Sequence, residues 1–375
     1  MLRMSRILLT LAFCLAALPL LTHAQTSNTT GAVFVMTNDA SNNQVIAYKR
    51  NADGSLTGRH TFNTGGRGSG GVTDPLASQG SLTLTGDHAF LLAVNAGSGD
   101  ISVFQVSGST LMLVGTTPCG GSEPVAVAQY GRLVYVLNAG GASNVTGFHL
   151  TTTGALKQIP NSTTYLTTGN TGAATVAFSP NGQTLLVTEK LTNNIDAFPV
   201  MANGTLGAIV VNPSAGPGLF GVLFAPDGAA ITTETGPTGG QDASAVSSYA
   251  VSSGGTLSVI SANVPTLANA TCWHVVTPNG KLLYTTNPGS GTLSGFWIGT
   301  NGSLTAVDGT VLATLPSGSA DLDLAVSSDG KYLYTIDSGT GSVSVLQINS
   351  DGTLTVLSGV SGLAANAGYN GIAAI

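Results

Sequence analysis

A sequence pattern that recurs seven times predicts an all-β fold, a single seven-bladed β-propeller with four-stranded blades. The clearest copies are TPNGKLLYTTNPGSGTLSGFWIGTNGSLTAV at 277–307 and SSDGKYLYTIDSGTGSVSVLQINSDGTLTVL at 327–357. The copies repeat every 45 to 52 residues, a period typical of one blade, as measured between the turn glycines Gly86, Gly131, Gly182, Gly228, Gly280 and Gly330. The first copy lacks its inner strand, and the end of the chain supplies one.

Each copy divides into four strands in the same order. An apolar inner strand precedes a turn such as Pro-Asn-Gly, and an alternating strand such as LLYTTN follows. A third strand such as LSGFWI then leads through an Asn-Gly or Asp-Gly hairpin to a short outer strand. We expect inner strands at 81–85, 124–129, 174–179, 221–226, 273–278, 322–327 and 370–375. The last of these should complete the blade that begins at residue 31, which closes the ring and leaves few exposed edges.

The N-terminus carries an export signal. Residues 1–24 read MLRMSRILLTLAFCLAALPLLTHA, in which Arg3 and Arg6 precede an apolar run and a small-residue ending. We therefore expect a signal peptide at 1–24, a short linker at 25–30 and one propeller domain at 31–375. The mature protein is expected to be secreted or periplasmic. No later segment has the ~18 uninterrupted apolar residues that a membrane span needs.

Composition excludes several classes of protein. Loss of Arg3 and Arg6 leaves 9 basic residues against 17 acidic ones, a net charge of −8, so no nucleic-acid partner is expected. Only 7% of residues are charged and 42% are hydrophobic, the opposite of a disordered chain. There is no Cys-His spacing for zinc, and we expect no metal and no cofactor. The mature protein is expected to be a monomer.

The glycine-rich segment at 64–71 resembles a nucleotide-binding loop but lacks the helix that such a loop needs. TGGRGSGG at 64–71 matches the G-x-G-x-x-G spacing of dinucleotide-binding loops, yet no helical pattern follows it. We expect a flexible rim loop there, with Arg67 free to reach over the channel mouth as a substrate-binding cation.

Cys119 and Cys272 belong to the third and sixth blades, which are not adjacent. A disulfide needs Cα atoms within ~7 Å, so we expect two buried free thiols.

Positions that break the repeat are candidates for function. The second strands end at Asn38, Asn95, Asn138, Glu189, Glu234, Asn287 and Asp337. Asn and Asp suit this place because they hydrogen-bond the following turn. Glu is a poor turn cap, so we identify Glu189 and Glu234 as candidate catalytic carboxylates near the channel mouth. The alternative is a pair of solvated rim charges. Lys190, next to Glu189, is a candidate for binding a negatively charged group.

Polar residues at the starts of inner strands form a second set of candidates. His274 is the only histidine expected on an inner strand, and it is a candidate catalytic acid or base. The alternative is that it is a buried histidine with a structural role. Asp321 and Asp323 are two residues apart and are expected to face the same side of their strand. Together they would raise one carboxyl pKa unless they are solvated or share a cation. The remaining substrate-binding candidates in this set are Gln79, Glu123, Trp273, Asp321 and Asp323.

The sequence motif of the repeats resembles that of the seven-bladed lactonase family, which includes 6-phosphogluconolactonases and carboxymuconate cyclases. The segments DPLASQGSL, LVYVLNAG, LLVTEK, SAVSSYAV and ATCWHVVTPNGKLLYTTN are similar to a secreted, lactonase-like branch. The resemblance covers essentially the whole mature chain. Phosphogluconolactonase-like members carry Gly-Pro-Arg-His at the start of the fifth inner strand, where this chain has Phe220 and Gly221 in the Arg and His places. Glu189 matches an acidic residue that those members often carry.

Two functions follow from these observations. The resemblance implies a lactonase, or a cyclase that interconverts a lactone and a carboxylate, acting on a small lactone or carbohydrate-derived ligand. Without the Arg and His, we expect a substrate other than 6-phosphogluconolactone. The alternative is a non-catalytic propeller that binds a glycan, a peptide or a surface partner through its loop-rich face.

Overall fold

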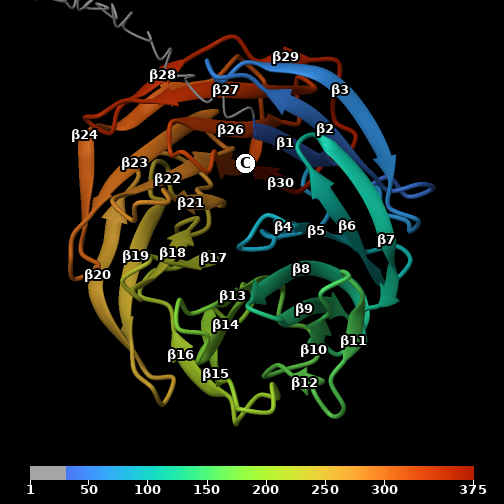
Figure 1. Cartoon of the computed structure of the whole chain (residues 1–375). Coiled ribbons are helices and arrows are strands. Elements are labelled where there is room, and N and C mark those ends of the chain that lie inside the picture. Colours follow the sequence, from blue (N-terminus) through green and yellow to red (C-terminus); the bar gives the residue numbers. More distant parts are fainter. Residues whose placement is uncertain (1–30) are drawn as a thin grey trace, which may run out of the picture.

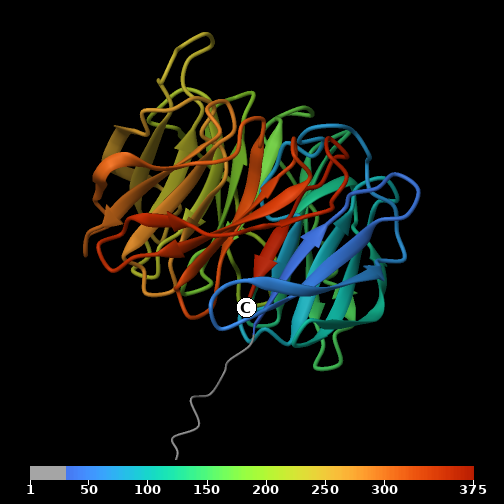
Figure 2. The same cartoon turned by 90° about the horizontal axis from the view of Figure 1, so that it is seen from above.

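The computed structural model describes residues 31–375, and every regular element within them is a β-strand. The strands form seven sheets in a ring around a central channel (Figure 1). In the view turned by 90°, the blades stand side by side with loops at both ends of their strands (Figure 2). The predicted seven-bladed β-propeller is therefore confirmed. The signal peptide and linker predicted at 1–24 and 25–30 lie outside the described residues.

The first four blades follow the chain from its N-terminal side. Blade 1 contains β1 (Gly31–Met36), β2 (Gln44–Arg50), β3 (Leu56–Asn63) and β30 (Ile372–Ala374). Blade 2 contains β4 (Leu82–Leu84), β5 (Phe90–Asn95), β6 (Asp100–Ser107) and β7 (Thr110–Pro118). Blade 3 contains β8 (Ser122–Tyr130), β9 (Leu133–Gly140), β10 (Asn144–Leu150), β11 (Leu156–Gln158) and the short β12 (Thr164–Tyr165). Blade 4 contains β13 (Ala173–Phe178), β14 (Thr184–Glu189), β15 (Asn194–Pro199) and β16 (Val210–Pro213).

The remaining three blades complete the ring. Blade 5 contains β17 (Leu219–Phe224), β18 (Ala230–Glu234), β19 (Ala245–Val251) and β20 (Leu257–Pro265). Blade 6 contains β21 (His274–Val276), β22 (Leu282–Asn287), β23 (Thr292–Ile298) and β24 (Leu304–Thr314). Blade 7 contains β25 (Asp321–Val326), β26 (Tyr332–Asp337), β27 (Ser342–Ile348), β28 (Leu354–Val356) and the short β29 (Val360–Ser361).

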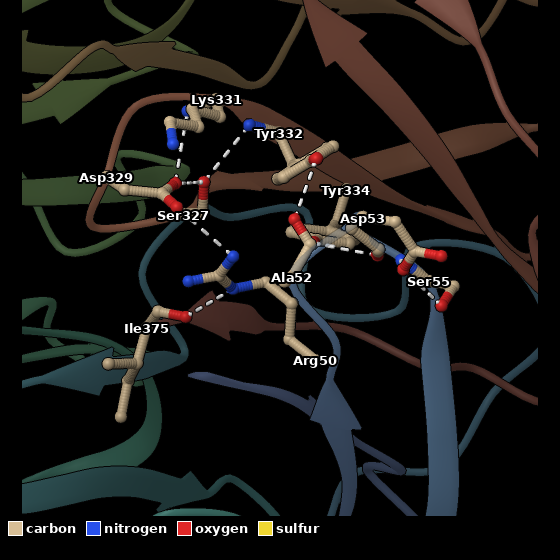
Figure 3. Close-up of polar contacts among 11 residues, drawn as sticks. Arg50, Ala52, Asp53, Ser55, Ser327, Asp329, Lys331, Tyr332, Tyr334 and Ile375 are labelled. Atoms are coloured by element: carbon tan, nitrogen blue, oxygen red, sulfur yellow. Dashed lines mark hydrogen bonds and ion pairs between the residues drawn. The ribbon is translucent and has the colours of Figure 1, made fainter. Parts of the chain in front are cut away.

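The two ends of the described chain meet in blade 1. Strand β30 pairs antiparallel with β1, with Val33 opposite Ala374, and Figure 1 shows the C-terminus beside β1. The buried Arg50 at the end of β2 secures this junction (Figure 3). Its Nε donates to the Ile375 carbonyl at 2.9 Å, and its Nη1 lies 3.2 Å from the Asp329 carboxylate in blade 7. The predicted closure by the C-terminal strand is confirmed.

Tyrosines of the second strands join each of three blades to the next one. The Tyr135 hydroxyl in blade 3 donates to Gly204 in the hairpin of blade 4. Tyr284 in blade 6 donates in the same way to Gly352, and Tyr334 in blade 7 to Gly54 in blade 1. The three hairpin glycines have φ between 80° and 83°, a conformation that favours glycine. These bonds explain why the repeat couples a strand tyrosine to an Asn-Gly or Asp-Gly hairpin.

The glycine-rich segment 64–71 is fixed to the rim. The Gly68 amide donates to the Asp39 carbonyl, and the Gly97 amide donates to the Arg67 carbonyl. A Cβ atom at Gly68 would lie only 2.1 Å from the carbonyl carbon of Asn38, so close backbone packing requires glycine there. The predicted flexible loop is therefore wrong: backbone hydrogen bonds hold it between the first two blades.

Candidate active site

A segment between blades 1 and 2 crosses the channel. The Ser78 hydroxyl donates to the Val125 carbonyl in blade 3, and the Gln79 amide donates to the Ala174 carbonyl in blade 4. On the opposite side of the channel, the Trp273 indole in blade 6 donates to the Ser78 carbonyl at 2.8 Å. Inner strands on both sides therefore hold this segment, residues 76–80, across the channel as a plug.

Gln79 fixes the centre of the plug. Its Nε2 donates to the His274 carbonyl at 2.6 Å, and its Oε1 faces the His274 amide at 3.4 Å. The side-chain amide thus pairs with the backbone of β21 as a neighbouring strand would. Gln79 also borders a channel cavity of about 350 Å³ that continues toward Phe178 and Phe224. The structure places this predicted substrate-binding residue between that cavity and the loop face.

A group of ionisable side chains lies on the loop side of the plug. Asp74 stands just before the plug, is half-buried and accepts a hydrogen bond from Asn370 Nδ2 at 2.9 Å. Lys190, after β14, donates from Nζ to the Ala77 carbonyl in the plug, and its Nζ lies 5.3 Å from the centre of the Phe220 ring. Asp323 in β25 is close enough for its charge to interact with that of Asp74. Three separate parts of the fold therefore meet here.

Burial moves the pKa values of these side chains toward neutral pH. It raises the pKa of Asp74 to about 7, although the Lys190 charge and hydrogen bonds from Ala77 and Asn370 oppose the shift. Burial lowers the pKa of Lys190, and the Asp74 charge opposes that change. Burial also raises the pKa of Asp323 to about 7. A carboxyl group that titrates near neutral pH beside an ammonium group is typical of acid–base sites.

Cys272 lies beneath the same group. Burial raises the pKa of its thiol, and the nearby Asp74 carboxylate adds to this effect while Lys190 opposes it. Both Cys272 and Cys119 are buried and unpaired, as predicted. A neutral thiol at this position packs as a small apolar group rather than acting as a nucleophile.

Glu189 and Glu234 are fully buried rather than exposed at the rim. Glu189 accepts hydrogen bonds from the Thr167 amide and hydroxyl and from the Thr192 hydroxyl. Glu234 accepts from three hydroxyl groups, those of Ser214, Thr232 and Ser247. The alternative of solvated rim charges is therefore wrong. Both glutamates hold the turns of their own blades, as Asn287 does in blade 6 through its bonds to Thr271 and Thr292.

His274 and Trp273 also have internal partners. His274 is fully buried, and its Nε2 lies 3.1 Å from the Ile231 carbonyl while its Nδ1 has no partner among residues 31–375. Burial lowers the His274 pKa to about 4, so the ring is neutral at physiological pH. The Trp273 ring packs edge-on against Phe220, with centroids 4.9 Å apart. The structure places both residues in the wall that holds the plug.

Asp321 and Asp323 do not share surroundings as predicted. The pairing of β25 with β26 shifts register between Asp321 and Leu324, which breaks the simple alternation of side chains. Asp321 accepts from the Asn287 amide and faces Asp337, whereas Asp323 accepts from Leu324 and interacts with Asp74. Of the two, Asp323 belongs to the ionisable group at the plug.

Two predicted substrate-binding residues lie at the rim. Arg67 is exposed, and its backbone is fixed by hydrogen bonds to Ser98. Glu123 is exposed at the start of β8 and has a φ of 53°. Within the described part of the chain, neither side chain has a hydrogen bond to the group at the plug. The structure therefore brings together Gln79, Lys190, Trp273, His274 and Asp323, but not Arg67 or Glu123.

Sequence reasoning missed Asp74. The residue lies in a connection outside the repeat, so comparison of the copies gives it no counterpart. One signal was present, since Asp74 opens the DPLASQGSL segment that carries part of the family resemblance. Its φ of 44° and that of Ala77, 46°, are unusual for residues other than glycine and mark a constrained backbone.

The start of β17 carries Phe220 and Gly221 in the places where phosphogluconolactonase-like proteins carry Arg and His. Phe220 is buried, and a Cβ atom at Gly221 would lie 3.0 Å from both Gln79 Oε1 and His274 Cε1. Gln79 and His274 therefore occupy the space that a larger side chain at position 221 would need. Among residues 31–375, no three His, Cys, Asp or Glu side chains are grouped so that they could hold a metal ion.

Comparison with known proteins agrees with this architecture. The sequence model of a family described as "Lactonase, 7-bladed beta-propeller" matches residues 23–165. The N-terminal part of the chain is therefore similar to a lactonase-family propeller. No curated protein matches the sequence significantly. For the part of the chain that the structure describes, no helix is long and apolar enough to cross a membrane.

Solved structures resemble this propeller over most of its length. A periplasmic gluconolactonase from Pseudomonas aeruginosa matches with a TM-score of 0.68 and 17% identity, over 91% of this chain and 99% of its own. A candidate 6-phosphogluconolactonase from Bacteroides uniformis matches with a TM-score of 0.67 and 18% identity, over 92% and 99%. One from Bacteroides fragilis matches with a TM-score of 0.66 and 20% identity, over 93% and 98%. At these identities the likeness establishes the fold.

Proposed function

We propose that the protein is an exported, monomeric lactonase that opens an unphosphorylated sugar lactone, or interconverts a lactone and a carboxylate, at the plug of the propeller. The observation that carries the proposal is that Asp74 and Lys190 lie together on the loop side of the plug, where Lys190 Nζ donates to the carbonyl of Ala77 and its charge acts on Asp74. The match to the lactonase family and the likeness to gluconolactonases support the substrate class. The apolar run and charged start of residues 1–24 support export.

Asp74 and Lys190 have complementary roles in this proposal. Ionised Asp74 takes a proton from a water molecule as the water oxygen attacks the lactone carbonyl carbon. The Lys190 ammonium group faces the negative charge that develops on the carbonyl oxygen. The ring C–O bond then breaks, and the proton on Asp74 passes to the departing ring oxygen. One lactone and one water give one hydroxy acid, and Asp74 is returned to its ionised form.

The charges around the site favour a neutral substrate over a phosphorylated one. Lys190 is the one cation whose charge acts on Asp74 among the described residues, whereas Asp323 adds a second carboxyl group. A phosphate dianion is usually bound by arginine or by several backbone amides. Phe220 and Gly221 offer an aromatic ring and no side chain where related proteins carry Arg and His. The ring suits the apolar face of a sugar better than a phosphate.

The test is a screen of the mature protein against aldonolactones, 6-phosphogluconolactone and muconolactones, with and without Ca²⁺. We expect turnover of an unphosphorylated lactone without added metal. Asp74→Asn and Lys190→Met should each reduce kcat/KM by at least about 100-fold. The matched control is Asp308→Asn, an exposed aspartate on β24. Preference for the phosphorylated lactone, or full activity in both site variants, would contradict the proposal.

A second candidate function is supported by a cavity on the opposite face. It measures about 590 Å³ and lies between the turns of blades 4 and 5. Its lining includes the side chains of Asn181, Gln183, Asp227 and Asn301 together with the Phe224 ring. Amide, carboxylate and aromatic groups in one concave site suit a carbohydrate. Glycan binding that Gln183→Ala abolishes, together with no lactone turnover, would favour the non-catalytic alternative.

A further inference from the structure

In each blade, one residue of the third strand lies close to the residue that ends the second strand. This third-strand residue pairs with the second-strand residue two positions before the end, as Ser247 pairs with Thr232 and Asp196 with Val187. In blades 2, 3, 5, 6 and 7 the residue is a serine or threonine. These residues are Ser102, Thr146, Ser247, Ser294 and Ser344. In blade 4 it is Asp196.

The direction of the hydrogen bond at this position depends on the end residue. In blades 2 and 6 that residue is an asparagine whose amide donates, from Asn95 to Ser102 at 2.7 Å and from Asn287 to Ser294 at 2.9 Å, whereas the Asn138 amide of blade 3 donates to Asn144 instead. Where it is an acid, the hydroxyl donates instead. Ser247 donates to Glu234 at 2.9 Å, and Ser344 donates to Asp337 at 2.6 Å. An acidic end residue therefore requires a proton donor on the third strand.

In blade 4 the end residue is an acid, Glu189, but the third-strand residue is also an acid. Both side chains are fully buried, and Asp196 occupies the register position from which Ser247 and Ser344 reach the end residues of their own blades. Both carboxyl oxygens of Asp196 lack a hydrogen-bond donor among residues 31–375. The remaining contacts of Glu189 come from Thr167 and Thr192, which donate to it. An aspartate can replace the serine as donor only when it carries a proton.

We propose that Asp196 is held as a neutral acid that donates its proton to Glu189, and that this proton fixes the turn that presents Lys190. The turn follows Glu189 directly. Thr192 bonds back to the Glu189 carboxylate, while the Lys190 and Leu191 amides donate to the Gly172 and Thr171 carbonyls. Loss of the proton places two like charges side by side beneath this turn. The part that concerns Lys190 rests on the proposed function; the shared proton does not.

The electrostatic surroundings of Asp196 agree with this arrangement. Burial, followed by the hydrogen bond and charge of Glu189, raises the pKa of Asp196 to about 8. The strands packed around it, β13, β14 and β16, carry no ionisable residue other than Glu189. The folded protein therefore keeps a proton that the unfolded chain releases above the ordinary pKa of 3.8. This contribution to stability is full below 3.8 and is lost as the pH rises toward about 8.

The first experiment compares the thermal stability of the full chain with that of Asp196→Ser between about pH 4 and pH 9. Serine is the residue that four other blades use at this position. We expect the Tm of the variant, relative to wild type, to rise with pH and to gain about 3 °C or more by the alkaline end. Ser344→Asp, the reverse exchange in blade 7, should introduce a new loss of Tm over the same range. Parallel curves for wild type and Asp196→Ser would overturn the proposal.

Infrared difference spectroscopy detects the proton directly. Wild type minus Asp196→Ser should show the carbonyl stretch of a protonated carboxylic acid at about pH 6, and the band should vanish above about pH 9. Absence of the band at the lower pH would overturn the shared proton. A Tm increase with Ca²⁺ in wild type but not in Asp196→Ser would also overturn it, because a cation would then join the two carboxylates.

Hydrogen exchange tests the effect on Lys190 without any substrate. At about pH 9, the segment 189–193 should exchange faster in wild type than in Asp196→Asn, whose amide donates to Glu189 at any pH. A segment of blade 1 serves as the internal reference. Equal exchange of 189–193 in the two proteins would overturn the positioning role. Because neither this measurement nor the infrared band requires turnover, failure of the lactonase proposal can be distinguished from failure of this one.

Discussion

Arg50 donates a hydrogen bond from its guanidinium Nε to the carbonyl oxygen of Ile375, 325 positions away in the sequence (Figure 3). The same guanidinium pairs with Asp329 and lies 5.9 Å from the centre of the Tyr332 ring. One buried side chain thus links the second strand of blade 1, the C-terminal strand and a turn of blade 7. The contact between Arg50 and Asp329 is the one ion pair that the structure shows among residues 31–375.

The first prediction concerns this junction. Arg50→Met should lower stability by about 2 kcal/mol or more, because it removes the two charge-assisted hydrogen bonds that the buried guanidinium makes to the Ile375 carbonyl and to Asp329. Lys49→Met is the matched control, since Lys49 is exposed on the same strand. Deletion of 366–375 should lower Tm further and cause association through the open edge of β1. A truncated protein that stays monomeric with an unchanged Tm would contradict the role of the closure.

The second prediction concerns the cysteines. Thiol titration of the mature protein under non-reducing, denaturing conditions should find two free thiols, since Cys119 and Cys272 are unpaired. In the native protein both should react slowly, because they are buried and burial raises the pKa of each thiol. An intramolecular bridge detected by mass spectrometry would contradict the structure around the plug.

The third prediction separates catalytic from structural roles for Glu234 and His274. Glu234→Gln should destabilise the protein by about 1–3 kcal/mol, because the new amide group faces hydroxyls that now donate to a carboxylate. If either residue acts in catalysis, Glu234→Gln or His274→Asn should reduce turnover by at least about 100-fold in protein that remains folded. Asn287→Asp, at the same level of blade 6, is the control. Small losses of turnover in all three would leave the chemistry at Asp74.

The fourth prediction is a pH dependence. Since Asp74 must be ionised to act as a base and its pKa is raised to about 7, kcat/KM should fall as the pH drops through about 7. The Lys190 charge holds this pKa down, so the residual activity of Lys190→Met should show its limb at higher pH. The same limb in both proteins would mean that another group controls the profile.

Most of the fold could be predicted from the sequence, because each blade of a propeller repeats the same pattern of strands and turns. The spacing of turn glycines, the Tyr135-type strand residues and the C-terminal NGIAAI each constrain the same ring. The candidate site could be read only in part, because a comparison of repeats reveals residues that differ from their counterparts. Asp323 and His274 were found in this way, and Lys190 was found because it stands next to Glu189. Asp74 was not, because it lies in a connection that no other blade has.

Two predictions about the candidate site failed for identifiable physical reasons. The glutamates were expected at the open mouth because glutamate caps turns poorly, yet hydroxyl groups of Thr167 and Ser247 supply the missing donors and allow full burial. The shared face of Asp321 and Asp323 was lost to an irregular pairing in β25. Neither the added donors nor the irregularity has a signature in the local sequence, since both depend on which strands become neighbours.

The closure of blade 1 by β30 also has a consequence for how the protein is made. A ribosome releases the N-terminal side of a chain first, so β1 emerges with one edge unpaired and remains so until residues 372–374 have been made. Six blades can assemble during that interval, but the circle cannot. The last step of biogenesis is thus an all-or-none docking event between the oldest and the youngest parts of the chain. Until that event, the edge of β1 keeps unpaired backbone groups that can associate with another chain.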